Sequence, residues 1–375
     1  MLRTMTANQN QSIPATMTAV VLTGHGDFDR LEVHHDWPTP TPGAGEVLIR
    51  VAACGLNNTD VNTRTAWYSK GVEENTTGGA FDSADEDDAT WGGAPLTFPR
   101  VQGADVCGEV VAVGEGADAA LIGKRVMLET WIRDWNDPMN LDAIGYFGSE
   151  CDGGFAHYTK IDQRYVHPID SHLSDTEIAS FATSYFTAEN MLNRANVGSG
   201  DTVLVPGASG GVGGALIQLA KRRGARVVAL CSESKREGVA ACGPDAILPR
   251  QPEDLRAALC EAIGNDTVSV VADVVGGDLW PALIDVLERG GRYTCAGAIA
   301  GPMVHMDLRT FYLRDLTFSG ATIVPPGVFA DLVGYIERGE IKPLVAEVFA
   351  LENLVDAQKA FIAKQHVGNI VVDCR

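Results

Sequence analysis

Hydrophobic positions in the middle of the chain follow a helical period, directly after a short apolar run and a glycine turn. The run is residues 203–205 and the turn is residues 207–213. Beyond the start of the turn, apolar side chains recur at the spacing of one helix face, at Val212, Leu216 and Leu219. This order predicts a buried strand, a tight turn and an amphipathic helix.

The turn between this strand and helix is built mostly from small residues. Such residues allow a tight bend, close approach of the backbone to an anion, and close packing of helix on strand. The first N–H groups of the helix can then bind phosphate oxygens. The pattern indicates a dinucleotide-binding turn whose predicted contacts are Ala208, Ser209, Gly210, Gly211, Val212 and Gly213.

Strand and helix patterns alternate through the next part of the chain. Short apolar runs predict five further strands, at residues 226–230, 245–248, 268–275, 290–297 and 316–320. A helical pattern over residues 174–195 leads into the first strand. Six strands with intervening helices predict an α/β fold with a doubly wound parallel sheet.

The preceding part of the chain alternates with the period of two that is typical of β-strands. The clearest case is residues 46–55, where every second side chain is apolar. Two stretches lack a clear period: an acidic loop at residues 69–95 and an irregular piece at residues 131–151. A loop as long as the first is typical of an insertion or a lid.

Composition narrows the expected partners and the cellular setting. The net charge of −20 disfavours nucleic acid and anionic membranes, so a small molecule is the expected partner. No apolar run reaches the roughly 18–20 residues that span a membrane, and no signal-peptide pattern opens the sequence. The eight cysteines are scattered without a CxxC pair, which favours reduced thiols in the cytoplasm over disulfides or a structural zinc site.

Seven motifs, in this order along the chain, carry a resemblance to a known family. They are PGAGEVLIRVAACGLNNTD, GADVCGEVVAVGEG, DGGFAHYTKI, VLVPGASGGVGGALIQLAKRRGA, VADVVGG, GGRYTCAGAIAG and HVGNIVV. The sequence resembles the medium-chain dehydrogenase/reductase superfamily. Within it, the sequence is most similar to the zinc-lacking branch that includes quinone oxidoreductases.

The resemblance implies a fold class and a division into domains. After a disordered tail at residues 1–16, a GroES-like β-barrel catalytic domain is expected over residues 17–170, completed by residues 322–375. A Rossmann NAD(P)-binding domain is expected at residues 171–321, with the active site in the cleft between the two. The resemblance also implies a homodimer.

Zinc-dependent members of this superfamily carry three catalytic metal ligands, and this sequence differs at all three. The matching positions hold Asn57, Ala104 and a residue near Thr183. A catalytic zinc needs about three N, S or O ligands from the protein, and this set does not supply them. The four-cysteine structural lobe is also missing, since only Cys151 lies in that region. We therefore expect no zinc and no other metal.

Without a metal, hydride transfer depends on geometry and on hydrogen bonds to the oxygen that gains charge. By the family match, Asn57 and Asp60 line the site, with Asn57 donating to a carbonyl and Asp60 orienting its neighbours. Thr187 and Gly297 are expected beside the cofactor. Asn369 stands where relatives usually have Lys, so any role of that lysine is lost here.

The residues that follow this motif are candidates for the substrate wall. Arg64 is expected to polarise a carbonyl or bind a carboxylate, with Trp67 beside it. Tyr68 or Tyr185 is expected to donate a proton. The expected substrate is a quinone or an α,β-unsaturated carbonyl compound, because conjugation spreads the developing charge.

The choice of cofactor depends on the residues after the second strand of the sheet. Ser232, Lys235 and Arg236 can hold a 2′-phosphate by charge-assisted hydrogen bonds, which favours NADPH. Glu233 is a contrary sign, because an acid at the strand tip would hold the 2′-OH of NADH. NADH therefore stays open as an alternative.

Three other functions fit parts of the sequence. An alcohol or aldehyde dehydrogenase-type carbonyl reductase would use the same fold, and a non-catalytic NADPH-binding regulatory protein would need no catalytic residue. The turn also matches the G-x-S-x-G nucleophile elbow of hydrolases. In that case Ser209, Asp273 and either His305 or His366 would form a triad.

Overall fold

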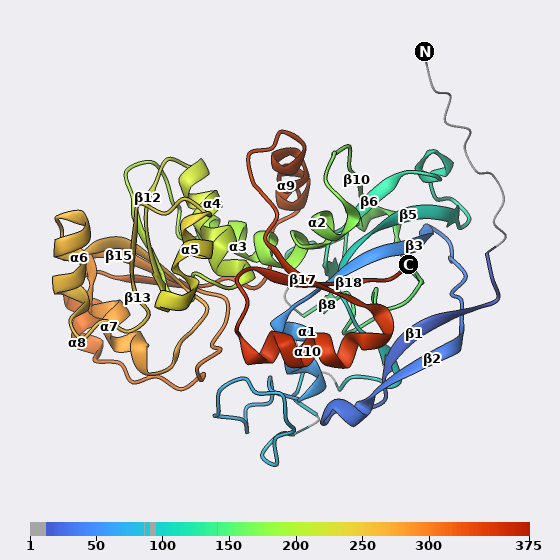
Figure 1. Cartoon of the computed structure of the whole chain (residues 1–375), viewed down its shortest axis with the longest axis horizontal. Coiled ribbons are helices and arrows are strands. Elements are labelled where there is room, and N and C mark those ends of the chain that lie inside the picture. Colours follow the sequence, from blue (N-terminus) through green and yellow to red (C-terminus); the bar gives the residue numbers. More distant parts are fainter. Residues whose placement is uncertain (1–12, 86, 91–94, 141) are drawn as a thin grey trace.

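The computed structural model describes residues 13–85, 87–90, 95–140 and 142–375. Two bodies lie side by side: a parallel sheet with its helices, and a barrel domain that contains the first and last described strands (Figure 1). Most of the predicted tail, residues 1–12, lies outside the described residues, and β1 begins at Thr16. No helix in the described ranges is long and apolar enough to cross a membrane.

A six-stranded sheet forms the first body. Its strands are β11 (Thr202–Val205), β12 (Arg226–Cys231), β13 (Ala246–Pro249), β14 (Val268–Asp273), β15 (Leu287–Cys295) and β16 (Thr317–Gly320). Their spatial order is β13-β12-β11-β14-β15-β16, and every neighbouring pair is parallel. This is the strand order of a dinucleotide-binding fold, so the prediction of a doubly wound sheet is confirmed.

Helices cover both faces of this sheet because its strands are apolar on both sides. Val203 and Val205 of β11 belong to a core shared with α3 (Ala182–Arg194), α4 (Gly211–Arg222) and α5 (Arg236–Ala240). Leu204 packs in a second core with α6 (Leu255–Ile263) and α7 (Trp280–Asp285). The short helix α8 (Leu308–Leu313) leads into β16.

Mostly antiparallel strands form the barrel domain, as the predicted fold class requires. A small sheet pairs β1 (Thr16–Leu22) with β2 (Leu31–Pro38) and β4 (Arg100–Val101). The larger sheet runs β10-β6-β5-β3-β18-β17, with β9 also paired to β3. Its strands are β3 (Glu46–Leu56), β5 (Asp105–Val113), β6 (Arg125–Leu128), β9 (Tyr158–Asp162), β10 (Val166–Pro168), β17 (Val345–Ala350) and β18 (Asn369–Asp373).

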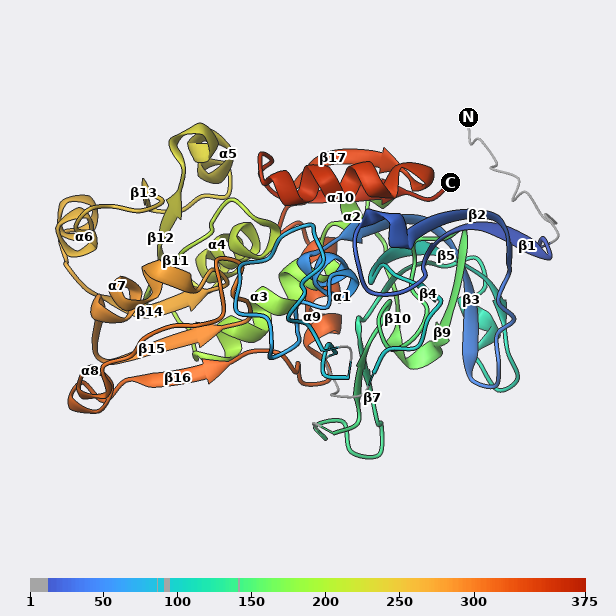
Figure 2. The ribbon, with the colours of Figure 1, turned by 90° about the horizontal axis from the view of Figure 1, so that it is seen from below.

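Strand β18 brings the C-terminal part of the chain into the barrel. It lies between β3 and β17, antiparallel to the first and parallel to the second. Helix α10 (Leu354–Ala363) connects β17 to β18 and packs against both. Figure 2 shows it running alongside β17. Helix α9 (Val328–Glu337) packs on α3. Residues 345–373 therefore extend the barrel sheet, while the predicted domain boundaries themselves stay a prediction.

Two segments differ from the predicted secondary structure. The helical pattern at residues 174–195 is interrupted, and forms α2 (Asp175–Ala179) and α3. The piece at residues 131–151, which lacked a period, contains a hairpin of β7 (Trp131–Arg133) and β8 (Ile144–Tyr146). Strands of three residues are too short to show an alternation in the sequence.

Helix α1 (Asn58–Arg64) follows β3 and leads into the acidic loop. The described residues of the loop form neither helix nor strand. The Ser69 hydroxyl accepts the N–H of Asp85 at 2.8 Å, which folds the loop back on itself. The N–H of Thr76 donates to the carbonyl of Ile299 at 3.1 Å. The loop therefore reaches from the barrel domain to the parallel sheet.

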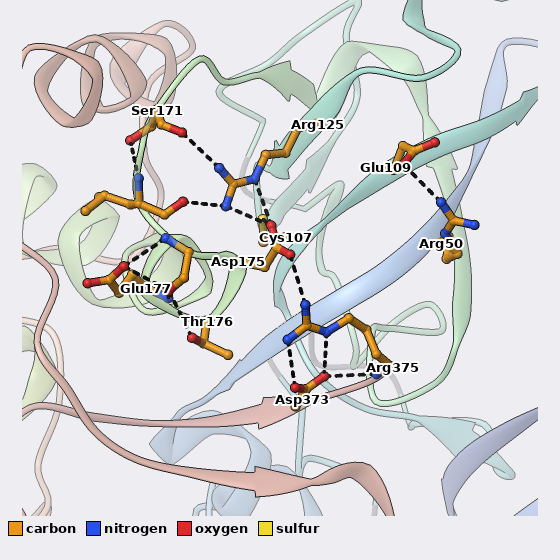
Figure 3. A network of polar contacts seen from close by, with 12 residues as sticks. Arg50, Cys107, Glu109, Arg125, Ser171, Asp175, Thr176, Glu177, Asp373 and Arg375 are labelled. Carbon is orange, nitrogen blue, oxygen red and sulfur yellow. Dashed lines mark hydrogen bonds and ion pairs between the residues drawn. The ribbon is translucent and has the colours of Figure 1, made fainter. Parts of the chain in front are cut away.

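A network of ion pairs joins β6, α2 and the chain after β18 within the barrel domain (Figure 3). Asp175 lies 2.7 Å from the guanidinium of Arg125 and 3.7 Å from that of Arg375. A cavity of about 480 Å³ beside it is also lined by Arg50, which pairs with Glu109 at 3.0 Å. These charges neutralise one another, so the network is structural.

Candidate active site

A cavity with a volume of about 180 Å³ lies between the barrel domain and the glycine turn. Its wall combines α1 and the start of the acidic loop, the β7–β8 hairpin, α3, and the residues after β15. A second cavity, of about 330 Å³, continues along the turn toward the end of β12. The two share Asn58, Thr76, Gly207 and Gly210, so they form one continuous site.

The glycine turn contributes to the walls of both cavities, and its sequence allows a very tight bend. Gly207 has a φ of +66°, a left-handed conformation that favours glycine. A Cβ on Gly213 would lie 2.3 Å from the Gly207 carbonyl oxygen, so α4 can start this close to β11 only with glycine there. No side chain of the described residues caps α4 at Gly210. The first turn of α4 thus offers backbone N–H groups to an anion.

The predicted cofactor residues of the turn divide between the two cavities. Gly210 and Gly211 line both, Val212 and Gly213 line the first, and Ser209 lines the second. Ala208 is instead buried beneath the turn, where its N–H donates to the Leu230 carbonyl at 3.2 Å. Its role is to let the turn pack on the sheet. Thr187 and Gly297 both line the first cavity.

Basic residues gather at the far end of the second cavity. Ser232 and Lys235 line it as the sequence predicted, together with Arg250 and Lys364. The Lys235 ammonium donates to the carbonyl of Lys364, whose own ammonium donates to Asn58 Oδ1 at 3.0 Å. Burial and the nearby Lys235 charge lower the pKa of Lys364 to about 7. An anion here would be met by several positive groups.

The structure places Arg236 differently from its predicted position. Its guanidinium lies 3.9 Å from Glu233, on the exposed side of the segment after β12, and Arg250 takes its place in the wall of the second cavity. Arg250 directly follows β13, and Lys364 ends α10 in a left-handed conformation with φ +51°. The sequence signal for Arg250 is a basic residue at a strand end, whereas the approach of Lys364 from another domain leaves no local signal.

Asn57 and Asp60 are brought together at the start of α1. The Asp60 carboxylate accepts the N–H of Asn57 at 2.8 Å, and the N–H of Asp60 donates to the Asn57 carbonyl at 3.2 Å. Burial raises the pKa of Asp60 to about 7. The Asn57 side chain lines the first cavity, while Asp60 holds the backbone behind it. Asp60 thus fixes the backbone at Asn57, and its role in the site stays a prediction.

Tyr68 and Trp67 both line the first cavity. Burial raises the pKa of Tyr68 to about 12, so its phenol stays protonated. The Trp67 indole N–H donates to the Glu74 carbonyl at 2.9 Å, which ties the acidic loop to the cavity wall. Tyr68 is therefore placed where a proton donor could act.

Two other predicted substrate contacts differ from the structure. The buried Arg64 guanidinium donates to Gln358 Oε1 at 2.9 Å and to the carbonyls of Gly26 and Gly78 at 2.7 and 3.1 Å. These bonds hold the Arg64 guanidinium inside the barrel domain, outside the walls of the two cavities. The Tyr185 hydroxyl donates to the Lys342 carbonyl at 2.6 Å, so it also holds structure rather than substrate.

A chain of three polar side chains, missed by sequence reasoning, closes the first cavity. The Tyr146 hydroxyl, on β8, hydrogen-bonds the hydroxyl of Thr183 in the first turn of α3. That hydroxyl and the Thr183 N–H, at 3.0 Å, both bond Asp105 at the start of β5. Burial raises the pKa of Asp105 to about 6, while the bonds from Thr183 act in the opposite direction. Tyr146 and Thr183 line the cavity.

The donor set at this place does not fit a catalytic zinc. The three positions that match the ligands of zinc-dependent relatives hold an amide, a methyl and a hydroxyl, at Asn57, Ala104 and Thr183. Among the described residues, no cluster of three or more His, Cys, Asp or Glu side chains could hold a metal ion. The two carboxyl groups beside these positions already accept hydrogen bonds, Asp60 from the N–H of Asn57 and Asp105 from the N–H of Thr183.

Asn369 links the glycine turn to the barrel domain. Its Oδ1 accepts the hydroxyl of Ser184 at 2.8 Å, and its Nδ2 donates to the Ser180 carbonyl at 3.0 Å. A Cβ on Gly211 would lie 2.0 Å from this Oδ1, so the glycine turn and the segment at Asn369 are in close contact. At this position, the chain therefore has a buried amide that is fully engaged in hydrogen bonds.

The hydrolase triad is not assembled. Asp273 accepts the hydroxyl of Tyr293 at 2.8 Å and the N–H of Val275 at 2.7 Å, with no histidine among the hydrogen-bond partners described for it. His366 lies in the same cavity wall as Ser209, but burial lowers the pKa of this histidine to about 4 and weakens it as a base. The glycine turn therefore fits a cofactor rather than a nucleophile.

Comparisons with known proteins agree with this geometry. Residues 43–171 match the family "Alcohol dehydrogenase GroES-like domain", and residues 211–338 match "Zinc-binding dehydrogenase". Acryloyl-coenzyme A reductase of Metallosphaera sedula is 25% identical over 366 residues, covering 95% of this chain and 99% of that protein. Human quinone oxidoreductase is 24% identical, covering 92% and 94%.

A solved structure is similar over nearly the whole chain. It is a crystal structure of a protein from Sinorhizobium meliloti 1021, named only provisionally as an alcohol dehydrogenase. It is 44% identical, covers 97% of this chain and 98% of its own, and superposes with a TM-score of 0.87. With both domain families matched in order, the chain belongs to the medium-chain dehydrogenase/reductase superfamily of oxidoreductases.

Proposed function

We propose that the protein is an NADPH-dependent, zinc-independent reductase that transfers a hydride to a quinone or an α,β-unsaturated carbonyl compound. The observation that carries this proposal is the lining of the first cavity, where the groups that can face a substrate oxygen are neutral hydrogen-bond donors. Asn57, Tyr68 and Tyr146 offer amide and hydroxyl groups to an oxygen that gains negative charge. A conjugated substrate needs no stronger electrophile, because its developing charge is spread.

The nucleotide would lie across both cavities. In the proposed complex, the first turn of α4 binds the pyrophosphate, and Thr187 and Gly297 contact the nicotinamide. Ser232, Lys235 and Arg250 hold the 2′-phosphate. When bound, NADPH supplies the hydride. The protein supplies the position, the hydrogen bonds and the exclusion of water.

The shape of the first cavity supports a flat substrate. Trp67, Trp131, Tyr146 and Phe361 contribute aromatic rings to its wall, and the Trp131 and Tyr146 rings meet edge to face with centroids 5.3 Å apart. Such walls favour planar, conjugated molecules over long saturated ones. The acidic loop covers this side through Thr76 and Trp67.

We further infer a homodimer, built by edge-to-edge pairing of β16. This strand is an edge of its sheet, and the preceding helix α8 exposes Leu308, Tyr312 and Leu313. Unpaired strand edges and clustered apolar side chains are typical of an interface between copies. Light scattering on the purified protein should give twice the mass of one chain. A monomer would overturn this assembly.

The test of the function is oxidation of NADPH and NADH by metal-analysed protein against a panel of acceptors. The panel contains a small quinone, an α,β-unsaturated ketone and a saturated aldehyde. We expect turnover of the first two, faster with NADPH, by protein without stoichiometric zinc. Turnover of the aldehyde alone by zinc-loaded protein would instead indicate an alcohol dehydrogenase-type reductase. Cofactor binding without any turnover would overturn the proposed substrates.

A further inference from the structure

We propose that Asp105, Thr183 and Tyr146 form a proton relay, with Tyr146 as the catalytic residue that gives the proton to the reduced substrate. This inference rests on the proposed function and assigns the proton donor that it leaves open. The three side chains come from β5, α3 and β8, so they meet only where α3, which covers the parallel sheet, packs against the barrel domain. Their oxygens are joined by two consecutive hydrogen bonds.

The geometry allows the relay to run in either direction. Before transfer, a protonated Asp105 donates to the Thr183 hydroxyl, Thr183 donates to Tyr146, and Tyr146 donates to the substrate oxygen. After transfer, the same heavy atoms are bonded with the opposite polarity: Tyr146 donates to Thr183 and Thr183 to the Asp105 carboxylate. A hydroxyl can both give and accept a proton, which is why Thr183 can connect the other two.

The step is balanced in atoms and electrons. The substrate gains a hydride, and with it two electrons, from the reduced nicotinamide, which is oxidised. The anion that forms takes the Tyr146 proton. Tyr146 takes the proton of Thr183, and Thr183 takes the proton of Asp105. Asp105 ends as a carboxylate and regains its proton from water before the next turnover.

Burial explains why the relay needs its last member. The phenol of Tyr146 is buried, which raises its pKa well above the ordinary value and disfavours a phenolate. Tyr146 alone would therefore be a poor acid. Burial raises the pKa of Asp105 to about 6, so this group stays partly protonated near neutral pH. It can return a proton through Thr183 to the Tyr146 phenol as the phenol gives its own proton to the substrate. Asp60 and Cys54 also face Asp105, and a negative charge on Asp105 raises the pKa of both groups, so Cys54 stays a neutral thiol.

Tyr68 is the competing donor, because it lines the same cavity. The described contacts distinguish the two tyrosines. Tyr68 interacts with Thr59 and Asn62, a hydroxyl and an amide. Tyr146 is connected through one hydroxyl to a carboxyl group. The described hydrogen bonds therefore connect Tyr146 to an acid, and substitution of each tyrosine decides between the two.

The decisive experiment compares Tyr146→Phe with Tyr68→Phe on two substrates. Hydride addition to an enone gives a strongly basic enolate, whereas addition to a quinone gives a weakly basic hydroquinone anion that water can protonate. We expect Tyr146→Phe to lower kcat on the enone by about 100-fold or more, in the range for lost general acid catalysis. On the quinone, the loss should stay below about 10-fold.

Thr183→Val should also lower kcat on the enone much more than on the quinone. Thr183→Ser should keep kcat on the enone close to that of the wild type, since Ser keeps the hydroxyl. Tyr158→Phe is the matched control, because Tyr158 lies on β9 and lines the cavity of about 480 Å³ beside the ion-pair network rather than the candidate active site. An enone rate that falls with Tyr68→Phe but not with Tyr146→Phe would overturn the relay and leave the proposed function standing.

A second measurement does not depend on turnover. Asp105 and Asp60 should both give infrared bands of protonated, buried carboxyl groups, and the band of Asp105 is the one that is lost in Asp105→Asn and kept in Asp60→Asn. It should shift in Tyr146→Phe and Thr183→Val while the melting temperature stays close to that of the wild type. A band that is unchanged by both substitutions would show that the chain is not connected, and would overturn the relay even if no substrate is turned over.

Discussion

At the scale of single residues, Asp60 is a buried carboxyl group whose neighbours partly offset the cost of its charge. Its Oδ2 accepts the N–H of Asn57, which favours the ionised form, but burial prevails and raises its pKa to about 7. The unfolded chain has a pKa near 3.9 at this residue. The folded state thus holds a proton on Asp60 that the unfolded state has already lost.

This difference predicts a pH dependence of stability. The contribution of Asp60 is fully present below about pH 4 and is lost as pH rises through about 7, because the folded state binds the extra proton. Asp60→Asn stays neutral at all pH values. The melting temperature of this variant minus that of the wild type should therefore increase as the pH is raised from 5 to 8. Each unit of pKa difference is worth about 1.4 kcal/mol, so a gain of several degrees is expected.

Calorimetry at several pH values measures this gain. Asp29→Asn is the control, because the side chain of Asp29 is 73% exposed. The control should show the same pH profile as the wild type. A constant difference between Asp60→Asn and wild type from pH 5 to pH 8 would contradict the assignment.

The position of a residue in a motif does not give the direction of its side chain, as α1 shows. Asn57 begins the helix and faces the first cavity, whereas Arg64 ends the helix and points into the barrel domain. Both follow from one sequence motif, but the direction of Arg64 depends on acceptors at Gly26, Gly78 and Gln358. These acceptors are distant in the sequence, so no local pattern could indicate them.

At the scale of elements, the acidic loop between α1 and β4 depends on one glycine. A Cβ on Gly71 would lie 2.1 Å from the carbonyl oxygen of Ser83, so Gly71→Ala must push these two segments of the loop apart. Because Trp67 and Thr76 connect this loop to the first cavity, we expect the KM for substrate to rise by roughly 10-fold. The melting temperature should change much less, since the described part of the loop forms no helix or strand.

Gly79→Ala is the matched control in the same loop. A Cβ there would lie 3.5 Å from Asp27 Oδ1, an ordinary contact. Steady-state kinetics and thermal melting of both variants separate the outcomes. Equal KM values for Gly71→Ala and Gly79→Ala would show that the loop does not shape the site.

Elements with a clear period were predicted well, and short ones were not. The strands of the parallel sheet and α4 follow directly from apolar spacing, and the glycine turn follows from its small residues. The hairpin of β7 and β8 has three residues in each strand, and it carries Tyr146. The break between α2 and α3 places Thr183 in a first helical turn, where its N–H meets Asp105. Tertiary contacts alone produce both features.

At the scale of the whole molecule, positive groups from two domains meet at the second cavity. Lys235 and Arg250 belong to the parallel-sheet domain, while Lys364 ends a helix of the barrel domain. In a chain with a net charge of −20, this local concentration of positive charge is unusual. A 2′-phosphate held by Lys235 and Arg250, as proposed, would be connected to the barrel domain through the hydrogen bond between Lys235 and the Lys364 carbonyl.

This arrangement predicts that NADPH protects the fold more than NADH does. At equal concentrations, NADPH should raise the melting temperature further, because the tighter ligand stabilises more. Arg250→Gln should remove most of this difference, with a loss of NADPH affinity of about 10- to 100-fold for a charged hydrogen bond of about 1.5–3 kcal/mol. Binding of NADH should stay the same.

Arg236→Gln is the control, because Arg236 pairs with Glu233 outside the cavity wall. Thermal shift and fluorescence titration with both nucleotides measure the effect. If Arg250→Gln binds NADPH as tightly as the wild type, or if Arg236→Gln loses the preference, the 2′-phosphate site is placed wrongly.

The position of β18 has a consequence for synthesis of the protein on the ribosome. The parallel sheet is built from one continuous segment, residues 202–320, so it can fold as soon as that segment has emerged. The barrel sheet cannot, because β3 emerges early and β18, at residues 369–373, must insert beside it. For most of translation, the edge of β3 at residues 53–56 therefore has no partner strand, while β9 can already pair with residues 46–50. That edge is where a nascent chain would need the protection of a chaperone.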